Sequence, residues 1–199
     1  MKNSVATSII RRIKAKKRGW VFTPKDFLDL GTRSNVDFVL HQLVHKKIIR
    51  KISLGIYDYP AKHPKLGILS PTLDKMLRAI SVKTGEVIQP SGSEAANWLG
   101  LSTQVPTKPI YFTSGRSRVV AIGNETITLR HTSIKPLNGQ PDKPSLIVQA
   151  LLHLGKQHID NLVMQICSRQ LSAKQKNDLR HMASQAPGWL THIIHNIAA

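Results

Sequence analysis

Side chains able to contact nucleobases gather in one short stretch, and a set of side chains able to contact phosphates, all but one of them basic, follows it directly. The first set is Arg33, Ser34, Asn35, Phe38, His41 and Gln42. The second set is Lys46, Lys47, Arg50, Lys51 and Ser53. Guanidinium, amide, hydroxyl and imidazole groups can bond to base edges, whereas lysine and arginine bind phosphates and fix a protein on the backbone. This stretch therefore predicts contact with a nucleic acid.

The pattern of residues 31–60 predicts the elements that would position these side chains. Ser34 and Asp37 have the spacing of a capping box, so a helix is expected over residues 35–46. Its apolar residues share one face: Val36, Val39, Leu40, Leu43 and Val44. Strand-forming residues follow at 48–52 and 56–59, and the glycine-containing loop 53–55 between them predicts a hairpin. A recognition helix followed by a β-wing is the second half of a winged helix.

Phe38 lies on the outward, polar face of the expected helix. It either contacts a thymine methyl group or packs on a neighbouring element. Packing is favoured, because a large apolar side chain usually has a partner. Asp37 is a poor neighbour for phosphate, and its expected role is to cap the helix. We expect the helix to enter the major groove and the wing to lie on the adjacent backbone.

A basic helix is expected upstream, over residues 4–16, because apolar residues recur there at helical spacing and Gly19 follows. Its basic residues form a further candidate phosphate track: Arg11, Arg12, Lys14 and Lys17. Residues 20–22 predict a short buried strand. Thr23-Pro24-Lys25-Asp26 predicts the start of a short helix, with threonine as cap and proline in the first turn.

The charge of the chain is strongly and unevenly basic. It has 29 Lys and Arg against 11 Asp and Glu, a formal net charge of +18, and residues 1–65 hold 15 of the basic and 4 of the acidic residues. Such an excess suits a polyanionic partner. A generally basic protein, with lysines that protect an edge strand, is the alternative. The position of the charge beside two capped helices favours duplex DNA.

The remaining sequence predicts an α+β protein of two domains. Residues 60–71 contain three prolines and are expected to link an N-terminal winged helix-turn-helix domain, residues 1–62, to a C-terminal domain, residues 63–199. The C-terminal domain is predicted to be mixed α/β, with a small antiparallel sheet and a helical tail. Its expected strands are 110–113, 118–122 and 126–130, with a turn at 123–124, and its expected helices are 73–80, 94–99, 146–154, 159–168, one capped by Ser172, and 189–197.

Several kinds of chemistry lack the residues they need. Cys167 is the single cysteine, so disulfides and cysteine-based zinc sites are excluded within the chain, and its apolar helical setting predicts a buried, inert thiol. No phosphate-binding glycine loop or catalytic acidic cluster is present. The pairs His153/His158 and His192/His195 fit surface histidines better than metal ligands. We expect no enzyme activity, no cofactor and no metal, and no apolar run is long enough to span a membrane.

Three segments carry a family resemblance: NVDFVLHQLVHKKIIRKISLGIYDYP, EAANWLGLSTQVPTKPIYFTSG and RSRVVAIGNETITLRHT. With them the chain resembles the AbiEi-type antitoxins of abortive-infection, type IV toxin–antitoxin systems, and related winged-helix transcriptional regulators. The resemblance implies a winged helix that binds operator DNA upstream of its own operon and a C-terminal domain needed for antitoxicity. It also implies a neighbouring gene for a nucleotidyltransferase-like toxin, which need not bind the antitoxin directly. The tail from Ser172 onward matches no motif of that family.

The expected function is that of a cytoplasmic, nucleoid-associated antitoxin and transcriptional autorepressor, acting on double-stranded DNA as a monomer or homodimer. The first alternative is an RNA-binding or ribosome-associated basic protein, which the net charge suits equally well. Aromatic residues make up 5% of the chain, which leaves few side chains on which RNA bases could stack. The second alternative is a toxin-binding or scaffold protein that uses its basic residues against an acidic partner.

Overall fold

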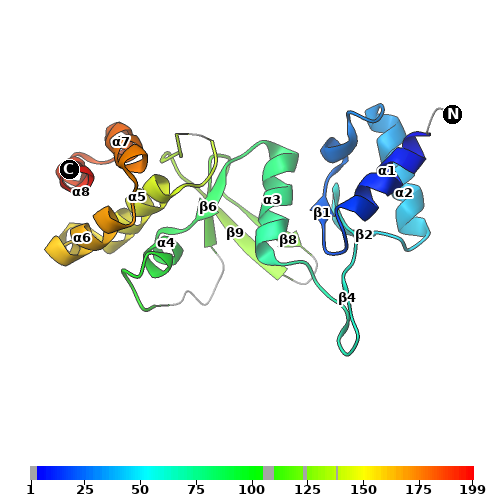
Figure 1. The fold of residues 1–199 in the computed structure, drawn as a ribbon, viewed down its shortest axis with the longest axis horizontal. Coiled ribbons are helices and arrows are strands. Elements are labelled where there is room, and N and C mark those ends of the chain that lie inside the picture. The colour runs from blue at the N-terminus through cyan, green and yellow to red at the C-terminus, as the bar shows by residue number, and fades with distance from the viewer. Residues whose placement is uncertain (1–3, 105–109, 123–124, 138) are drawn as a thin grey trace. The chain divides into compact units, whose positions relative to one another are not determined.

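The computed structural model describes residues 4–104, 110–122, 125–137 and 139–199, and the fold is α+β, as predicted (Figure 1). Contacts within the chain divide it into two compact units. The first comprises Met1–Glu86 with Ala121–Glu125, and the second comprises Val87–Val120 with Thr126–Ala199. The sequence placed the boundary at 62/63, whereas this division assigns helix α3 (Leu73–Thr84) to the first unit. The turn predicted at 123–124 lies outside the described residues.

The first unit begins with a helix, a strand, a 3-10 turn, a second helix and a hairpin. These are α1 (Val5–Ala15), β1 (Val21–Phe22), η1 (Pro24–Phe27), α2 (Arg33–His45), β2 (Arg50–Ser53) and β3 (Ile56–Asp58). The strands form an antiparallel sheet in the order β1-β3-β2. The predicted first helix and the hairpin are confirmed, and the short helix predicted from Thr23 is a single 3-10 turn.

Aromatic and aliphatic side chains form the core of this unit. Phe22 and Phe27 meet edge to face with 5.4 Å between their ring centroids. The ring centroids of Trp20 and Phe22 are 4.6 Å apart. Buried aliphatic residues of both helices complete the core: Ile9, Ile13, Val36, Val39, Leu40 and Leu43. Burying one such side chain stabilises a fold by about 1.5–3 kcal/mol. This packing fixes α2 with one face inward and leaves the opposite face in solvent.

Helix α2 begins earlier than the sequence predicted. Its N-cap is Thr32, whose hydroxyl accepts a hydrogen bond from the N–H of Asn35 at 3.4 Å. The predicted capping box of Ser34 and Asp37 is wrong, because Ser34 lies inside the helix and Asp37 accepts a bond from Arg33 instead. Threonine and serine are both good caps, so the local sequence allowed either start.

Residues 60–71, predicted as a linker, contain a second hairpin. Strand β4 (Lys62–His63) pairs antiparallel with β5 (Gly67–Ile68). In the turn between them, Nδ1 of His63 accepts hydrogen bonds from the N–H groups of Lys65 and Leu66, both at 3.2 Å. The three prolines that suggested a linker lie outside both strands, so they remove no hydrogen bond from the ladder.

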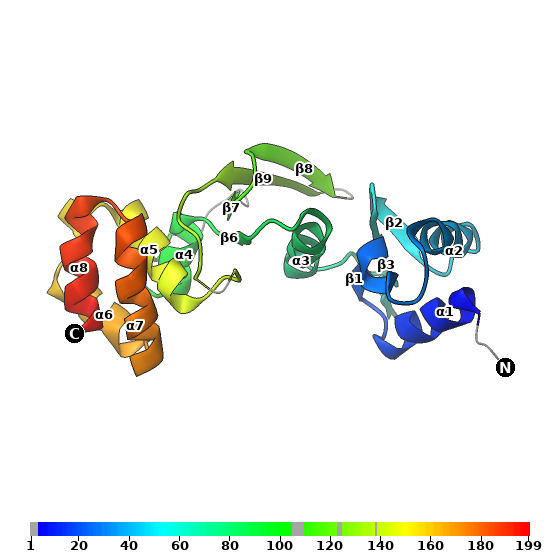
Figure 2. The same cartoon turned by 90° about the horizontal axis from the view of Figure 1, so that it is seen from above.

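The second unit combines a sheet with a helical C-terminal part (Figure 2). In chain order its elements are β6 (Ile88–Pro90), α4 (Gly92–Trp98), β7 (Ile110–Thr113), β8 (Arg118–Ile122), β9 (Glu125–His131), α5 (Lys143–Leu154), η2 (Lys156–His158), α6 (Asn161–Arg169), α7 (Ala173–Met182), η3 (Ala183–Gln185) and α8 (Gly188–Ala198). The end of β8 and the first residue of β9 belong to the first unit by the division given above. The predicted helices and the three predicted strands are confirmed, whereas β6 was not predicted. The cap of α7 is the predicted one, since Ser172 and Gln175 exchange hydrogen bonds.

The prediction of a small antiparallel sheet in this unit is correct only in part, because the sheet is mixed: β6 pairs antiparallel with β7, from Ile88↔Thr113 to Pro90↔Tyr111. The strand order is β6-β7-β9-β8, and β7 runs parallel to β9, from the pair Ile110↔Thr128 to the pair Thr113↔His131. Turn residues between strands indicate that neighbours in sequence reverse direction. They do not show that β9 lies between β7 and β8, because that placement depends on contacts between distant residues.

Helices α4, α5, α7 and α8 contribute to one apolar core that includes Leu151, Leu179 and Ile194. Cys167 of α6 is completely buried in the same core, which confirms the predicted buried thiol. No helix in the described ranges has both the length and the apolar character needed to cross a membrane.

We expect Cys167 in the native protein to react very slowly with Ellman's reagent between pH 7 and 9. Burial raises the pKa of its thiol to about 11, so the reactive thiolate is scarce over this range. Absorbance-monitored modification should show no fast phase until denaturant is added, and then one thiol per chain. A fast stoichiometric phase in the native protein would contradict the packing of α6.

Candidate nucleic-acid interface

Helix α2 divides its side chains between a buried and an exposed face. Val36, Val39, Leu40 and Leu43 are buried in the core. The exposed residues include the whole predicted base-side set: Arg33, Ser34, Asn35, Phe38, His41 and Gln42. One short helix thus presents hydroxyl, amide, imidazole and guanidinium groups to solvent. These groups match the donors and acceptors of base edges in a major groove, which is wide enough to admit a helix.

Phe38 lies in the middle of this exposed face and is 64% exposed. The sequence favoured packing of Phe38 on a neighbouring element. Within the described residues this prediction is wrong, because most of the side chain is in solvent. Val36 and Phe38 are two positions apart on the helix, so they lie on nearly opposite sides of it. With Val36 fully buried, Phe38 must face solvent. An exposed aromatic side chain among polar ones is a candidate contact for a partner.

Aspartates of the first unit engage two arginines near this face. Nε of Arg33 donates to Asp37 at 2.8 Å. Arg12 holds Asp29 through two hydrogen bonds of 2.6 and 2.5 Å and also donates to the carbonyl of Asp26. The bonds from Arg12 hold the pKa of the Asp29 carboxyl below its usual value. Arg12 was predicted to meet phosphate, but its guanidinium is occupied by these contacts.

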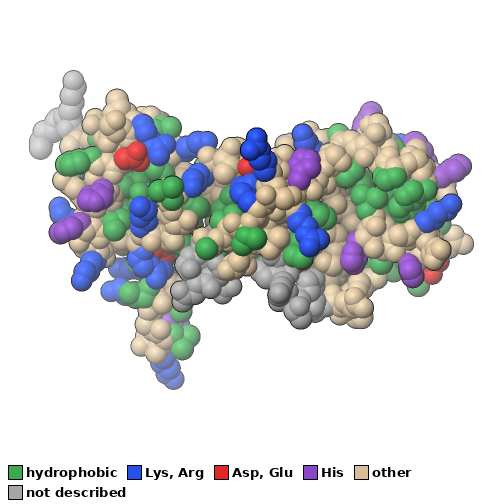
Figure 3. Space-filling view, turned by 180° about the vertical axis from the view of Figure 1, so that it is seen from behind, with side chains coloured by type: hydrophobic (Ala, Val, Ile, Leu, Met, Phe, Trp, Pro, Cys, Tyr) green, Lys and Arg blue, Asp and Glu red, His purple; other side chains and the backbone are tan. Residues whose placement is uncertain are grey.

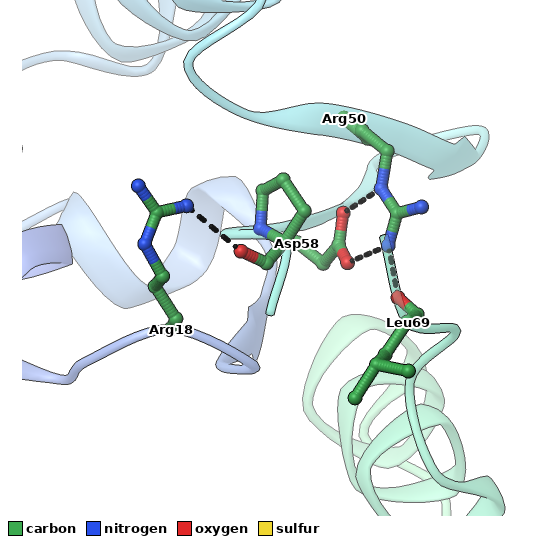
Figure 4. Close-up of polar contacts among 5 residues, drawn as sticks. Arg18, Arg50, Asp58 and Leu69 are labelled. Carbon is green, nitrogen blue, oxygen red and sulfur yellow. Dashed lines mark hydrogen bonds and ion pairs between the residues drawn. The ribbon is translucent and has the colours of Figure 1, made fainter. Parts of the chain in front are cut away.

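Arg50 makes the most buried of these ion pairs (Figure 4). Its Nε and Nη2 donate to the two carboxylate oxygens of Asp58 at 3.0 and 2.5 Å, and Nη2 also donates to the carbonyl of Leu69 at 2.8 Å. Asp58 is completely buried. The hydrogen bonds to Asp58 raise the pKa of the Arg50 guanidinium. Arg50 was predicted to bind the DNA backbone, and its main contacts are instead within the protein.

The other predicted backbone residues remain exposed. The side chains of six residues are in solvent, and in the described part of the chain none of these side chains makes a hydrogen bond or an ion pair: Arg11, Lys14, Lys17, Lys46, Lys47 and Lys51. Lys17 and Lys47 each follow a helix with left-handed backbone, at φ of 64° and 56°. Lysine and arginine side chains are spread over the face of the first unit seen in Figure 3. These cations are available to phosphates.

The hairpin β2–β3 ends in a two-residue loop, Leu54 and Gly55, beside the half-buried Ser53 of the predicted backbone set. The side chain of Leu54 is 75% exposed, and its carbonyl accepts a hydrogen bond from Nζ of Lys83 on α3 at 2.6 Å. Sequence reasoning missed Lys83, because nothing local links residue 83 to residue 54. The contact ties the tip of the hairpin to a helix of the same unit.

The second unit holds a cavity of about 740 Å³ whose lining includes Phe112, Gln149 and Leu152. The titratable side chains in this lining are His131 and His153. Nε2 of Gln149 donates to the hydroxyl of Thr132 at 3.2 Å. In residues 4–104, 110–122, 125–137 and 139–199, no three His, Cys, Asp or Glu residues are grouped so that they could hold a metal ion. The cavity lining offers hydroxyl, amide and imidazole groups for hydrogen bonding.

Comparison with known proteins establishes a family. A model for a family of unknown function, DUF6088, matches residues 8–179, so the chain belongs to that family. No curated protein matches the chain. Among solved structures, the crystal structure of the RV2827C protein from Mycobacterium tuberculosis is similar, with 13% sequence identity and a TM-score of 0.47. That match covers 98% of this chain and 76% of the other.

We expect Arg50→Ala to lower the free energy of unfolding by about 3–5 kcal/mol, because it leaves the buried carboxylate of Asp58 without its partner. Lys51→Ala removes a charge from the next, exposed residue and should change stability by less than about 0.5 kcal/mol. Urea unfolding followed by circular dichroism measures both variants. Equal stability of the two would show that the Arg50–Asp58 pair does not hold this unit together.

Proposed function

We propose that this protein is a sequence-specific, double-stranded DNA-binding transcriptional regulator whose first unit is a winged helix. The observation that carries the proposal is the exposed face of α2, with its hydrogen-bonding groups and Phe38 in solvent and its apolar face buried. In this proposal α2 enters the major groove, and Ser34, Asn35, His41 and Gln42 contact base edges.

The order of elements in the first unit supports this reading. The chain runs α1, β1, η1, α2 and then the hairpin β2–β3, and the three strands form one small sheet. A winged helix has the same order, with the recognition helix directly before the wing. The wing, β2–β3, would lie on the backbone beside the groove.

The different roles of the basic side chains also support the proposal. Arg12 and Arg50 stabilise the unit, whereas the exposed lysines beside α2 and on α1 would neutralise phosphates. Arg33 can bind a guanine or a phosphate if its guanidinium breaks the bond to Asp37 and bonds to that group instead. The ion pair between them is exposed, so this exchange loses little energy.

The resemblance to AbiEi-type antitoxins supplies the biological setting of the proposal. The protein would repress its own operon from an upstream operator and act against a nucleotidyltransferase-like toxin encoded next to it. The second unit would serve antitoxicity, with or without direct contact to the toxin. Such a protein would work in the cytoplasm, associated with the nucleoid.

Replacing exposed lysines of the proposed backbone set should weaken binding to all duplexes alike. We expect Lys47→Ala and Lys51→Ala each to reduce the slope of log affinity against log salt by about one, because each variant releases one fewer counterion. Fluorescence anisotropy with the duplex upstream of the gene and a random duplex of equal length measures this. The matched control is Lys156→Ala in the second unit. Unchanged slopes in both lysine variants would remove this surface from the DNA contact.

Replacing residues of the α2 face should instead change the preference between sequences. We expect His41→Ala or Gln42→Ala to reduce discrimination between the upstream duplex and the random duplex by about 1–3 kcal/mol, the usual range for a good base contact. The same anisotropy titrations at a fixed salt concentration give this difference. Equal losses on both duplexes would show that these side chains do not read bases, and preferential binding to structured RNA would favour the RNA-binding alternative.

A further inference from the structure

The hairpin β4–β5 projects from the rest of the first unit (Figure 1). Its side chains are in solvent. Every residue from Lys62 to Ile68 is exposed, and Leu66 and Ile68 are 72% and 55% exposed. An isolated two-stranded hairpin is marginally stable in water. Exposed leucine and isoleucine on such an arm are a liability unless they meet a partner.

Two arginines hold the base of this arm, one on each leg (Figure 4). Nη1 of Arg18 donates to the carbonyl of Pro60 at 3.0 Å, and Nη2 of Arg50 donates to the carbonyl of Leu69 at 2.8 Å. The N–H of Leu69 also donates to the carbonyl of Ala61 at 2.9 Å, which closes the two legs on each other. The arm is therefore anchored where it leaves the unit, and it presents its turn in a defined direction.

The side chains on the arm combine positive charge with an apolar tip. Residues 59–73 contain Lys62 and Lys65 and no aspartate or glutamate. Leu66 lies in the turn next to Lys65. Lysines with no acidic neighbour are complementary to a polyanion, whereas a purely apolar partner would leave them without a role. An apolar side chain flanked by cations is the arrangement that minor-groove proteins insert between bases.

The length of the arm is adequate for this use, although the minor groove, about 6 Å wide, must widen to admit more than the turn. A strand rises roughly 3.3 Å per residue, so a leg of about four residues reaches roughly 13 Å. The minor groove of B-form DNA is about 7.5 Å deep. The tip can therefore reach into the groove while Lys62, at the start of the arm, stays at the level of the phosphates, and the long side chain of Lys65 in the turn extends from the tip toward them.

We propose that the hairpin β4–β5 is a second DNA-contacting element, in which Lys62 and Lys65 bind phosphates beside the minor groove and Leu66 enters the groove. The inference rests on the proposed function and extends it to a duplex segment separate from the one that α2 reads. It assigns a binding role to residues that the sequence placed in a linker.

The test uses the full chain and the duplex upstream of its gene. The variants are Lys62→Ala/Lys65→Ala and Leu66→Ala. The matched controls in the second unit are Lys156→Ala/Lys174→Ala and Leu162→Ala, which also remove exposed side chains. Anisotropy titrations over a salt series give affinity and slope. Hydroxyl-radical footprinting reports protection of sugars along the minor groove. Thermal unfolding of each variant confirms that the fold is intact.

We expect Lys62→Ala/Lys65→Ala to reduce the salt slope by about two and to lose one protected segment of the footprint. Leu66→Ala should lose the same segment and weaken binding about 3- to 10-fold with the slope unchanged, since it removes apolar contact only. Both controls should bind like the unsubstituted protein.

Three outcomes would overturn the proposal. If both hairpin variants keep the original slope and footprint while His41→Ala loses selectivity, the regulator function stands and the arm is not on DNA. If the hairpin variants lose binding to a structured RNA and keep binding to the duplex, the arm serves RNA. If the unsubstituted protein does not distinguish its upstream duplex from a random one, the proposed function fails and the arm proposal fails with it.

Discussion

The first unit depends on one buried carboxylate and the arginine that neutralises it. Asp58 lies in the central strand of the β1-β3-β2 sheet, opposite Val21 on one side and Arg50 on the other. A buried charge without a partner is strongly destabilising, so the strand pairing must place Arg50 at this position. A shift of one residue would turn the arginine to the other face of the sheet. The same guanidinium bonds to Leu69, so the pair fixes both the register of the sheet and the path of the chain toward α3.

This constraint explains how the cations of the unit are divided. Arginine can hold a carboxylate with two parallel bonds and still donate to a carbonyl, which lysine cannot do in the same geometry. Arg12 and Arg50 are used in this way inside the unit, and lysines predominate on the exposed surface. Lysine is a point charge that carries little sequence information. In the proposed function, discrimination between DNA sequences would therefore fall on the polar face of α2 and not on the basic residues around it.

Local patterns in the sequence predicted those elements whose signals are local. The apolar stripe of α1, the strands on either side of Gly55 and the cap formed by Ser172 each depend on residues a few positions apart, and each was confirmed. The exposed face of α2 followed from the same periodicity. Where two residues were equally suitable, the sequence could predict the wrong one. Ser34 was predicted to cap α2, and the cap is Thr32.

Long-range contacts lay beyond the sequence patterns. No residue close in sequence to Arg12 or Arg50 indicates that these arginines form ion pairs with Asp29 and Asp58. Both arginines were therefore predicted to bind phosphates. The parallel pairing of β7 with β9 likewise depends on which distant strands meet. The hairpin within residues 60–71 was hidden because prolines indicate a break in structure, although here they lie outside the paired residues.

The anchoring of both hairpins bears on how this unit can recognise a partner. The tip of β2–β3 is tied to Lys83, and the legs of β4–β5 are tied to Arg18 and Arg50. Ordering a flexible segment on binding loses conformational entropy, and a segment that is already fixed avoids much of that loss. If the unit binds DNA as proposed, hairpins held in this way would present their lysines at defined positions without using binding energy from α2 to order them. The buried pair of Asp58 and Arg50 thus connects the internal stability of the unit to the geometry of its exposed basic surface.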